Sequence, residues 1–466
     1  MNPIRVVVAA GLLSLVLPSA AAAASPEVQA EARAMLEKMV SFETTADGGG
    51  TPAMAAWLRD GFVAAGFAPG DIEIVPVGNT VGMLVHYRPA AGTTTPPVVF
   101  LAHMDVVTVQ RDDWASDPWV LTERDGALYG RGVVDNKYGV LTVAQAFMRL
   151  KREGFVPDRE LVAAFTGDEE TGMKTTALLA ERLQGAAYAL NADAGGGFVN
   201  DDGSTYYVYQ AAEKTYATFE LTVKNPGGHS SIPRTDNAIY QLADALRRLA
   251  PHRFPVKWND ISLSSLASQV DSFPPEVGEA IVQFVEVPGD PAAVAVLETD
   301  PVVNRELRTT CVATMLRAGT AENALPASAT ATVNCRIFPG ETIAETQAEL
   351  QRVVADPAIA FKVLDDPVES PASELPEEAL AALKAVIARR APGAPVAPYQ
   401  EAGGTDGLHF RRAGIPTIGV GGLFASPESD YGFHGNDERL PLAEFAAGLD
   451  HFHGLISALA GGDDPA

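Results

Sequence analysis

Three continuous apolar segments stand out in the first half of the chain, at residues 98–102, 161–165 and 188–192. Stretches with helical spacing of apolar residues alternate with them, as at 140–151. Strands that are buried on both faces are apolar throughout, and their alternation with helices is typical of a parallel sheet covered on both sides. This pattern predicts an α/β domain with a mostly parallel sheet.

The pattern changes from about Thr215 onward, where apolar and polar residues alternate as in half-buried strands. The order of the segments is strand, helix, two strands, helix, strand, which predicts an α+β domain of ferredoxin-like order with its helices on one face of an antiparallel sheet. The first five of these segments are, in this order, 217–223, 237–249, 310–316, 329–337 and 343–354.

The parallel pattern then resumes, with a helical segment at 376–390 and an apolar run at 415–420. We therefore expect a domain formed by residues 25–214 and 367–466, into which a smaller domain at 215–366 is inserted. Residues 251–304 carry little periodic signal, and we expect an irregular insertion there.

The two cysteines of the chain, Cys311 and Cys335, lie in neighbouring strand-like segments. If 310–316 and 329–337 form a hairpin, residues whose numbers sum to 646 lie opposite each other, and the two cysteines form such a pair. A cross-strand disulfide and two buried thiols are both compatible with this position.

The N-terminus has the pattern of a secretory signal peptide. Arg5 precedes an apolar run at 6–17, and small residues follow up to Ala24. The run of about 12 residues is shorter than the roughly 20 that a membrane-spanning helix needs. We expect removal of residues 1–24, export to the periplasm or the medium, and no stable membrane insertion.

The chain is strongly acidic, with 34 lysines and arginines against 59 aspartates and glutamates. Removing residues 1–24 takes away Arg5 alone among the charged residues, which leaves 33 − 59 = −26. Such a charge disfavours nucleic acid and acidic lipid as partners.

Polar residues with metal-binding chemistry follow each apolar run. His103 and Asp105 lie two residues apart at a strand end, where both side chains point the same way. Asp135 follows a glycine-rich approach at 129–134 that lacks the phosphate-loop pattern. Three consecutive carboxylates follow the second run, and like charges there cannot all ionise without a cation or a raised pKa. These carboxylates are Asp168, Glu169 and Glu170.

Asp193 follows the third run, and His434 lies in a late loop rich in glycine and acidic residues. The whole set offers two imidazoles and several carboxylates, a mixture that suits zinc, with cobalt or manganese as substitutes.

Together these motifs resemble the di-zinc metallopeptidase family that includes glutamate carboxypeptidase, carnosinase, aminoacylase-1 and succinyl-diaminopimelate desuccinylase. The resemblance implies a zinc-exopeptidase-like catalytic domain and two divalent ions per chain. One ion would be held by His103, Asp135 and Asp193 and the other by Asp135, Glu170 and His434. It also implies a cis peptide bond after Asp135.

The resemblance assigns further roles. Glu169 would be the general base and acid, and Asp105 would orient His103. The inserted domain would be a lid and dimerisation domain, whose loop at 225–231 carries His229 to the oxyanion, often across the dimer interface. The substrate would be held by Asn323, Arg336, Gly404 and Thr405.

The sequence therefore predicts a hydrolase that cleaves an amide or peptide bond next to a free carboxylate, of carboxypeptidase or dipeptidase type. An N-acyl amino acid amidohydrolase, such as an aminoacylase or deacylase, is the alternative. Another two-zinc aminopeptidase family is disfavoured by the Gly-Gly-His-Ser loop at 227–230. A binding protein without chemistry is disfavoured because Glu169 and the ligands are all present, and a carbohydrate deacetylase would leave Arg336 without a purpose.

Overall fold

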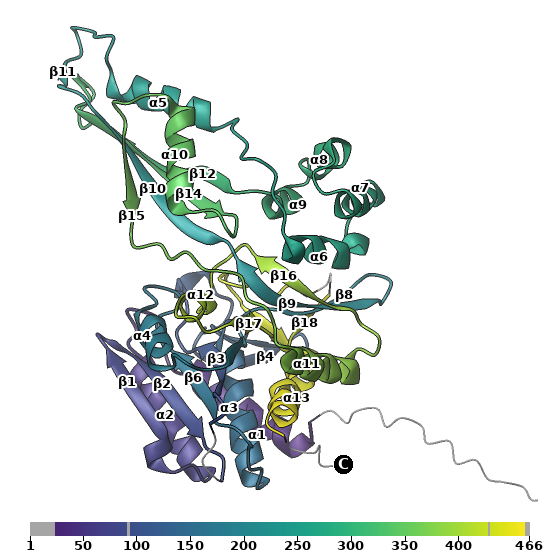
Figure 1. The fold of residues 1–466 in the computed structure, drawn as a ribbon. Helices are drawn as coiled ribbons and strands as arrows, with labels where there is room; N and C mark the ends of the chain where they lie inside the picture. Colours follow the sequence, from purple (N-terminus) through teal and green to yellow (C-terminus); the bar gives the residue numbers. More distant parts are fainter. Residues whose placement is uncertain (1–23, 91–93, 427–428, 462–466) are drawn as a thin grey trace, which may run out of the picture.

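A computed structural model of the chain describes residues 24–90, 94–426 and 429–461. The expected signal peptide lies outside these residues, apart from Ala24. The chain forms a large sheet with helices on both faces and a smaller sheet that is inserted between β9 and α11 (Figure 1). Within the described part, no helix is long and apolar enough to cross a bilayer.

The large sheet has a parallel centre, as expected, and mixed flanks. Four neighbouring strands, β6, β3, β7 and β17, are parallel, whereas β2 runs antiparallel to β6 and β9 antiparallel to β17. Beyond the centre, β16 pairs with β9 and β18 with β8 in parallel, while β1 and β2 and also β8 and β9 are antiparallel pairs. In spatial order the strands are β1 (Ile72–Val77), β2 (Thr80–Tyr87), β6 (Leu161–Thr166), β3 (Val98–His103), β7 (Tyr188–Asn191), β17 (Thr417–Gly419), β9 (Thr205–Glu213), β8 (Gly196–Val199) and β18 (Phe424–Ala425), with β16 (Val396–Glu401) paired to β9.

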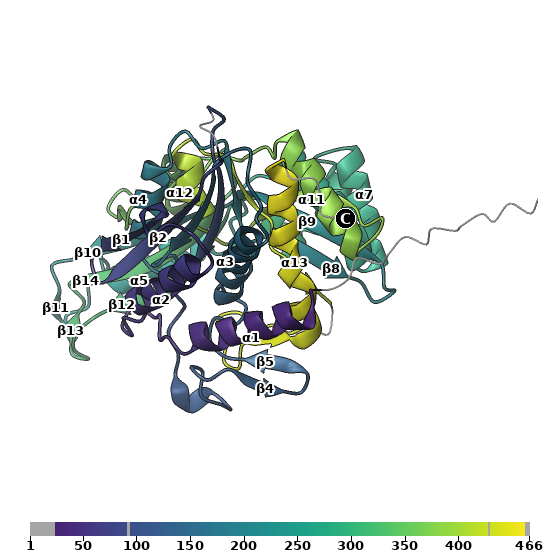
Figure 2. The same cartoon turned by 90° about the horizontal axis from the view of Figure 1, so that it is seen from below.

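Helices bury both faces of this sheet, because its central strands are apolar on both sides. In β3, Phe100 contributes to the core on one face and Val99 to the core on the other. The first face is covered by α1 (Pro26–Val40), α2 (Thr51–Ala64), α3 (Lys137–Arg152), α11 (Glu377–Arg390) and α13 (Leu442–Leu459), of which α1, α3 and α13 are in front in Figure 2. The second is covered by α4 (Lys174–Arg182) and α12 (Gly407–Arg412).

A short three-stranded sheet lies beside the first face and supports the late loop that carries His434. Its strands are β4 (Thr122–Arg124), β5 (Ala127–Tyr129) and β19 (Arg439–Pro441). Because β19 pairs with β5, the chain after His434 returns to the glycine-rich segment before Asp135.

The smaller sheet has the strand order that the sequence predicted. Its order is β12-β14-β10-β15, all antiparallel, and two helices bury one face against a separate core that includes Phe219, Leu242 and Leu350. The elements are β10 (Thr215–Lys224), α5 (Ala238–Leu249), β12 (Thr310–Ala318), β14 (Ser328–Ile337), α10 (Ile343–Val354) and β15 (Ala360–Leu364). A two-stranded tip, β11 (Gly228–His229) and β13 (Ala324–Leu325), extends from one end.

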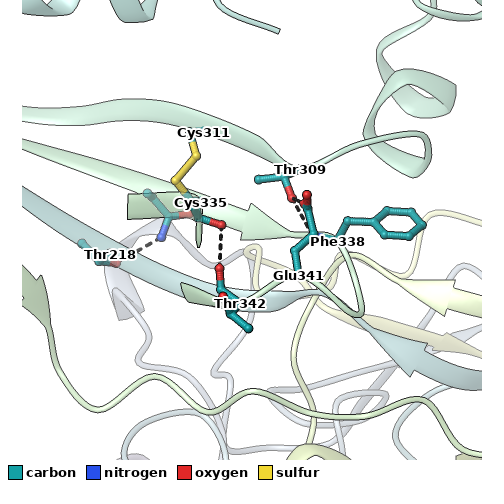
Figure 3. Close-up of a disulfide and its surroundings, with 9 residues drawn as sticks. Thr218, Thr309, Cys311, Cys335, Phe338, Glu341 and Thr342 are labelled. Carbon is teal, nitrogen blue, oxygen red and sulfur yellow. Dashed lines mark hydrogen bonds between the residues drawn. A yellow bond between two sulfur atoms is a disulfide. The ribbon is translucent and has the colours of Figure 1, made fainter. Parts of the chain in front are cut away.

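Cys311 and Cys335 form a disulfide between β12 and β14, so the open choice between disulfide and free thiols is resolved (Figure 3). The expected register holds at the cysteines but not farther along. A bulge between Ala313 and Met315 shifts the pairing by one residue, so that Met315 lies opposite Thr332. An extra residue of this kind gives no periodic signal in the sequence.

The expectation of an irregular insertion at 251–304 is wrong. The segment folds into four short helices with a core of their own, which includes Leu266, Phe284 and Leu297. Helix α6 packs on β16 and β9, so the insertion lies against the large sheet (Figure 1). The helices are α6 (Asp260–Ser268), α7 (Pro275–Glu286), α8 (Pro291–Leu297) and α9 (Pro301–Glu306).

Local signals for two of these helices were present in the sequence. Asp290 and Asp300 each precede a proline, and each side chain accepts hydrogen bonds from two backbone N–H groups of the following turn. Aspartate before a first-turn proline is a helix start. The helices are too short to produce visible periodicity.

Because His451 of α13 is buried, we expect the stability of the fold to fall at acidic pH. Burial, opposed by the hydrogen bond to the Val420 carbonyl, lowers the pKa of His451 to about 4. Because the unfolded chain binds this proton near its ordinary pKa of 6.5, the unfolding free energy falls as pH drops from about 6.5 to about 4, by up to about 3 kcal/mol. Chemical denaturation of His451→Gln, which keeps a donor for Val420, should show a smaller loss over this range than the wild type.

Candidate active site

The predicted ligands converge at the carboxyl ends of the parallel strands in two groups that share Asp135. His103 Nε2 lies 3.0 Å from Asp135 Oδ1 and 3.3 Å from Asp193 Oδ1. His434 Nε2 lies 3.1 Å from Asp135 Oδ2 and 3.2 Å from Glu170 Oε1. Each oxygen of Asp135 thus faces a different histidine, and each group contains one imidazole and two carboxylates.

Asp105 holds the loop that carries the paired glutamates. Its two carboxylate oxygens accept the backbone N–H groups of Glu169 at 3.1 Å and Glu170 at 3.0 Å. His103 Nδ1 lies 3.0 Å from the Asp105 carbonyl oxygen and 3.6 Å from its carboxylate. Asp105 therefore contacts His103 mainly through its backbone, and its side chain positions Glu169 and Glu170.

Glu438 supports Asp135 and was not singled out from the sequence. Fully buried, it accepts the backbone N–H groups of Gly132, Val134 and Asp135, and it pairs with Arg131 at 2.8 Å. The peptide bond that follows, Asp135–Asn136, is cis, as the resemblance implied. Asn136 Nδ2 in turn donates to Asp193 at 2.7 Å.

The histidines and carboxylates of the cluster shift one another's pKa values. Burial opposes protonation of His103, but the carboxylates of Asp193, Asp105 and Asp135 outweigh it and raise its pKa. The adjacent carboxylates of Asp135 and Glu170 raise the pKa of His434 to about 10. Burial raises the pKa of Asp193 to about 6. Positive charge is therefore favoured where the two imidazoles meet the carboxylates.

The donor set fits divalent cations. One ligand atom each from His103, Asp135 and Glu170 lies within 4.8 Å of the others. Glu170 Oε1 is buried and makes no hydrogen bond of acceptable geometry to the described residues, although His434 Nε2 is 3.2 Å away. A carboxylate oxygen and an imidazole nitrogen that lie this close without a hydrogen bond between them are arranged as two ligands of one metal ion would be.

Glu169 lies beside the cluster, at the junction of two cavities. It is 8% exposed, and burial raises its pKa well above the ordinary value, although the positive charge of His103 opposes this shift. A cavity of about 390 Å³ and one of about 620 Å³ share Glu169, Glu170 and Gly404. A bond held at this junction would extend one substituent into each cavity.

The two cavities differ in their walls. The smaller one is bounded by the cluster and by apolar side chains, among them Val134, Leu423, Phe433 and Phe452. The larger one lies between the two sheets and is lined by Lys214, Tyr216 and Arg336. Arg336 stacks on Tyr216, with its guanidinium carbon 4.6 Å from the ring centre, and donates to the Ala402 carbonyl at 3.0 Å.

Thr405 is close to the cluster but is tied into the protein. Its backbone N–H and its hydroxyl both donate to Glu213, at 2.9 and 3.2 Å, and its hydroxyl accepts from the Gly407 N–H. Its hydroxyl is therefore already hydrogen-bonded, which speaks against the expected direct bond to substrate. Thr405 holds the loop that presents Gly404.

His229 and Asn323 are not brought to this cluster within one chain. His229 is exposed on β11 at the tip of the smaller sheet, far from the large sheet in Figure 1, and its neighbour Ser230 donates to the Asn323 carbonyl. Arg336 lies near the other end of β14, eight or more residues from the tip, or roughly 26 Å at the rise of a strand. The expected pairing of Asn323 with Arg336 is therefore absent within the chain.

Asp406 is a further buried carboxylate that the sequence motifs did not single out. It accepts the hydroxyl of Thr166, which ends β6, at 2.6 Å, and that of Thr176 in α4. These two threonines flank the loop that carries Glu169 and Glu170. Asp406 thereby connects both ends of that loop to the loop of Gly404 and Thr405.

A family model described as Peptidase family M20/M25/M40 matches residues 99–458. The chain belongs to this family. The match spans both sheets and confirms the resemblance that the motifs indicated. The protein is therefore an enzyme of the metallopeptidase and amidohydrolase type.

Among curated relatives, the human N-fatty-acyl-amino acid synthase/hydrolase PM20D1 is 29% identical over 375 residues, which cover 77% of this chain and 73% of the relative. Among solved structures, the M20 metallo-carboxypeptidase Sso-CP2 of Sulfolobus solfataricus has a TM-score of 0.70 at 16% identity, covering 92% of this chain and 99% of that one. The Bacillus subtilis YXEP protein, described as a dinuclear metal binding peptidase, has a TM-score of 0.60 at 14% identity, covering 94% and 100%. These two structures share the fold.

Proposed function

We propose that this chain hydrolyses the amide bond of an N-acyl amino acid whose carboxylate is free, by attack of a water that Glu169 deprotonates. The observation that carries the proposal is the position of Glu169. It lies beside two imidazole–carboxylate groups and at the junction of an apolar cavity with a cavity that contains Arg336.

Two divalent ions, with zinc favoured by the mixed imidazole and carboxylate donors, would be held by His103, Asp193, Asp135, Glu170 and His434 and would acidify water and polarise the scissile carbonyl. Glu169 takes the proton of the attacking water as the oxygen adds to the carbonyl carbon. The raised pKa of Glu169 then suits it to donate that proton to the leaving nitrogen as the carbon–nitrogen bond breaks.

The direction of the substrate follows from the cavity walls. A guanidinium binds a carboxylate through parallel hydrogen bonds, so the free carboxylate is placed in the larger cavity near Arg336. The acyl group then enters the smaller cavity, where Phe433 and Phe452 form apolar walls. This placement, together with the similarity to the human fatty-acyl relative, favours the acyl substrate over a peptide.

Carboxypeptidase or dipeptidase activity is the second candidate. Glu401 lines the smaller cavity and offers a negative charge that a peptide's free amino group could approach. A panel that pairs N-acyl amino acids with dipeptides of the same C-terminal residue separates the two. A higher kcat/KM for the acyl compound supports the proposal, and a preference for the free dipeptide establishes the second candidate.

Arg336→Lys should raise KM for carboxylate substrates by about 10-fold or more while kcat changes less, because lysine keeps the charge but loses the bidentate contact. Arg317→Lys on the exposed part of β12 is the matched control and should change neither constant. Kinetics on an N-acyl amino acid and on its amide test the assignment. An equal loss for both substrates would remove Arg336 from carboxylate binding.

We further propose that the smaller sheet acts as the lid and dimerisation domain and that His229 and Asn323 serve the active site of a second copy. Their exposed position at the tip, away from their own cluster, supports this arrangement. Mixing Glu169→Gln chains with His229→Ala chains should restore about a quarter of wild-type activity through one intact site per mixed dimer. Monomeric, active protein would contradict the proposal.

Export of the chain after removal of residues 1–24 is also a proposal, and the N-terminal pattern supports it. Mass spectrometry of the protein recovered outside the cytoplasm tests it, since the new N-terminus should lie at or next to Ser25. Recovery of full-length chain from the cytoplasm alone would contradict export.

A further inference from the structure

A separate cavity of about 390 Å³ lies in the inserted region, away from the cluster. It is formed by the end of α5, the segment that follows it, the start of β12 and one side chain each from β14 and α10. It shares no lining residue with either active-site cavity. Its volume is within the range of small-molecule sites.

The walls of this cavity are apolar and basic. Leu246, Leu249 and Phe254 supply apolar surface, while His252, Arg253 and Arg308 supply basic groups. No aspartate or glutamate lines the cavity itself, although Glu349 lies 3.1 Å from His252 Nε2. The residues that line the cavity therefore favour an anion over a cation.

Arg308 gives the cavity a specific polar group. The side chain is 4% exposed, and its Nε is buried without a hydrogen-bond partner among the described residues. Its Nη2 lies 3.2 Å from Glu298, which does not line the cavity. A buried N–H without an acceptor is costly, so an acceptor from a ligand would be favoured there.

We propose that this cavity is a binding site for an amphipathic carboxylate, with the carboxylate accepting from Arg308 and the aliphatic chain lying against Leu246, Leu249 and Phe254. The free Nε–H of Arg308 supplies a charge-assisted bond, and the apolar wall supplies the hydrophobic contribution. A short carboxylate lacks the hydrophobic contribution, and an aliphatic alcohol lacks the charge-assisted hydrogen bond, so both should bind more weakly.

Isothermal titration of the metal-loaded protein with decanoate, decanol and propionate tests the site. Decanoate should bind at least 10-fold more tightly than either of the others. Arg308→Gln should weaken decanoate binding at least 10-fold. Ala313→Phe fills the cavity from an exposed position, so it should abolish this binding without unfolding the protein or changing hydrolysis.

Thr314→Phe is the matched control, because Thr314 is exposed on the same strand and does not line the cavity. It should bind decanoate as the wild type does. Unchanged decanoate affinity in Ala313→Phe would overturn the proposal, whatever the stability of the Arg308 variant, and so would decanol binding as tightly as decanoate. Neither result depends on which amide the active site cleaves.

Discussion

Glu169→Gln should lower kcat by about 10²–10⁴-fold, the range that a general base and acid contributes. The glutamine keeps the size of the side chain and is not among the predicted ligands, so the metal content should stay at the wild-type level. KM should change little, because the proposed contacts with the substrate are made by the walls of the two cavities and the Glu169 side chain lies between them. Steady-state kinetics and elemental analysis of the same preparation measure both quantities.

Measuring activity and metal content together distinguishes a catalytic role of Glu169 from a role in metal binding. Full activity in Glu169→Gln would show that another group moves the proton. A loss of activity together with a loss of metal would make Glu169 part of the metal-binding set.

Asp135→Asn should release metal and abolish most activity. The two oxygens of Asp135 face different histidines, at 3.0 and 3.1 Å, and an asparagine offers a single, neutral oxygen. Loss of a supporting contact alone costs roughly 10–100-fold in metal affinity, and loss of a shared ligand should cost more. Elemental analysis after dialysis and hydrolysis assays should both show the effect.

Asp125→Asn provides the matched control for that substitution. Asp125 is exposed in the turn between β4 and β5 and has a positive φ of 51°, a conformation that asparagine also tolerates. It should retain metal and activity. Two tightly bound metal ions in Asp135→Asn would rule out Asp135 as the shared ligand.

Much of the large domain and of the cluster could be predicted because the relevant signals are local. The runs that became β3, β6 and β7 are apolar apart from Asn191, and His103, Glu170 and Asp193 lie within five residues of their ends. Parallel strands that are neighbours in a sheet then bring these side chains together without further information. Asp135 and His434 were predicted as ligands from the motifs around them, and both lie in the same cluster as His103.

What the sequence could not supply depends on contacts between distant segments. Glu438 looks like an ordinary loop acid until β19 pairs with β5 and places it under Asp135. Asp406 likewise gains its role only where Thr166 and Thr176 meet it. The bulge in β12 and the shortest helices of the insertion, α8 and α9, lack a periodic signal, so contacts with other segments fix their structure.

We expect two metal ions, shared through Asp135, to enable the hydrolysis. The decisive experiment is stepwise addition of zinc to chelated protein, with an N-acyl amino acid as substrate. We expect no turnover after chelation and a return of activity that saturates at two zinc ions per chain. Saturation at one ion, or activity that survives complete removal of metal, would contradict it.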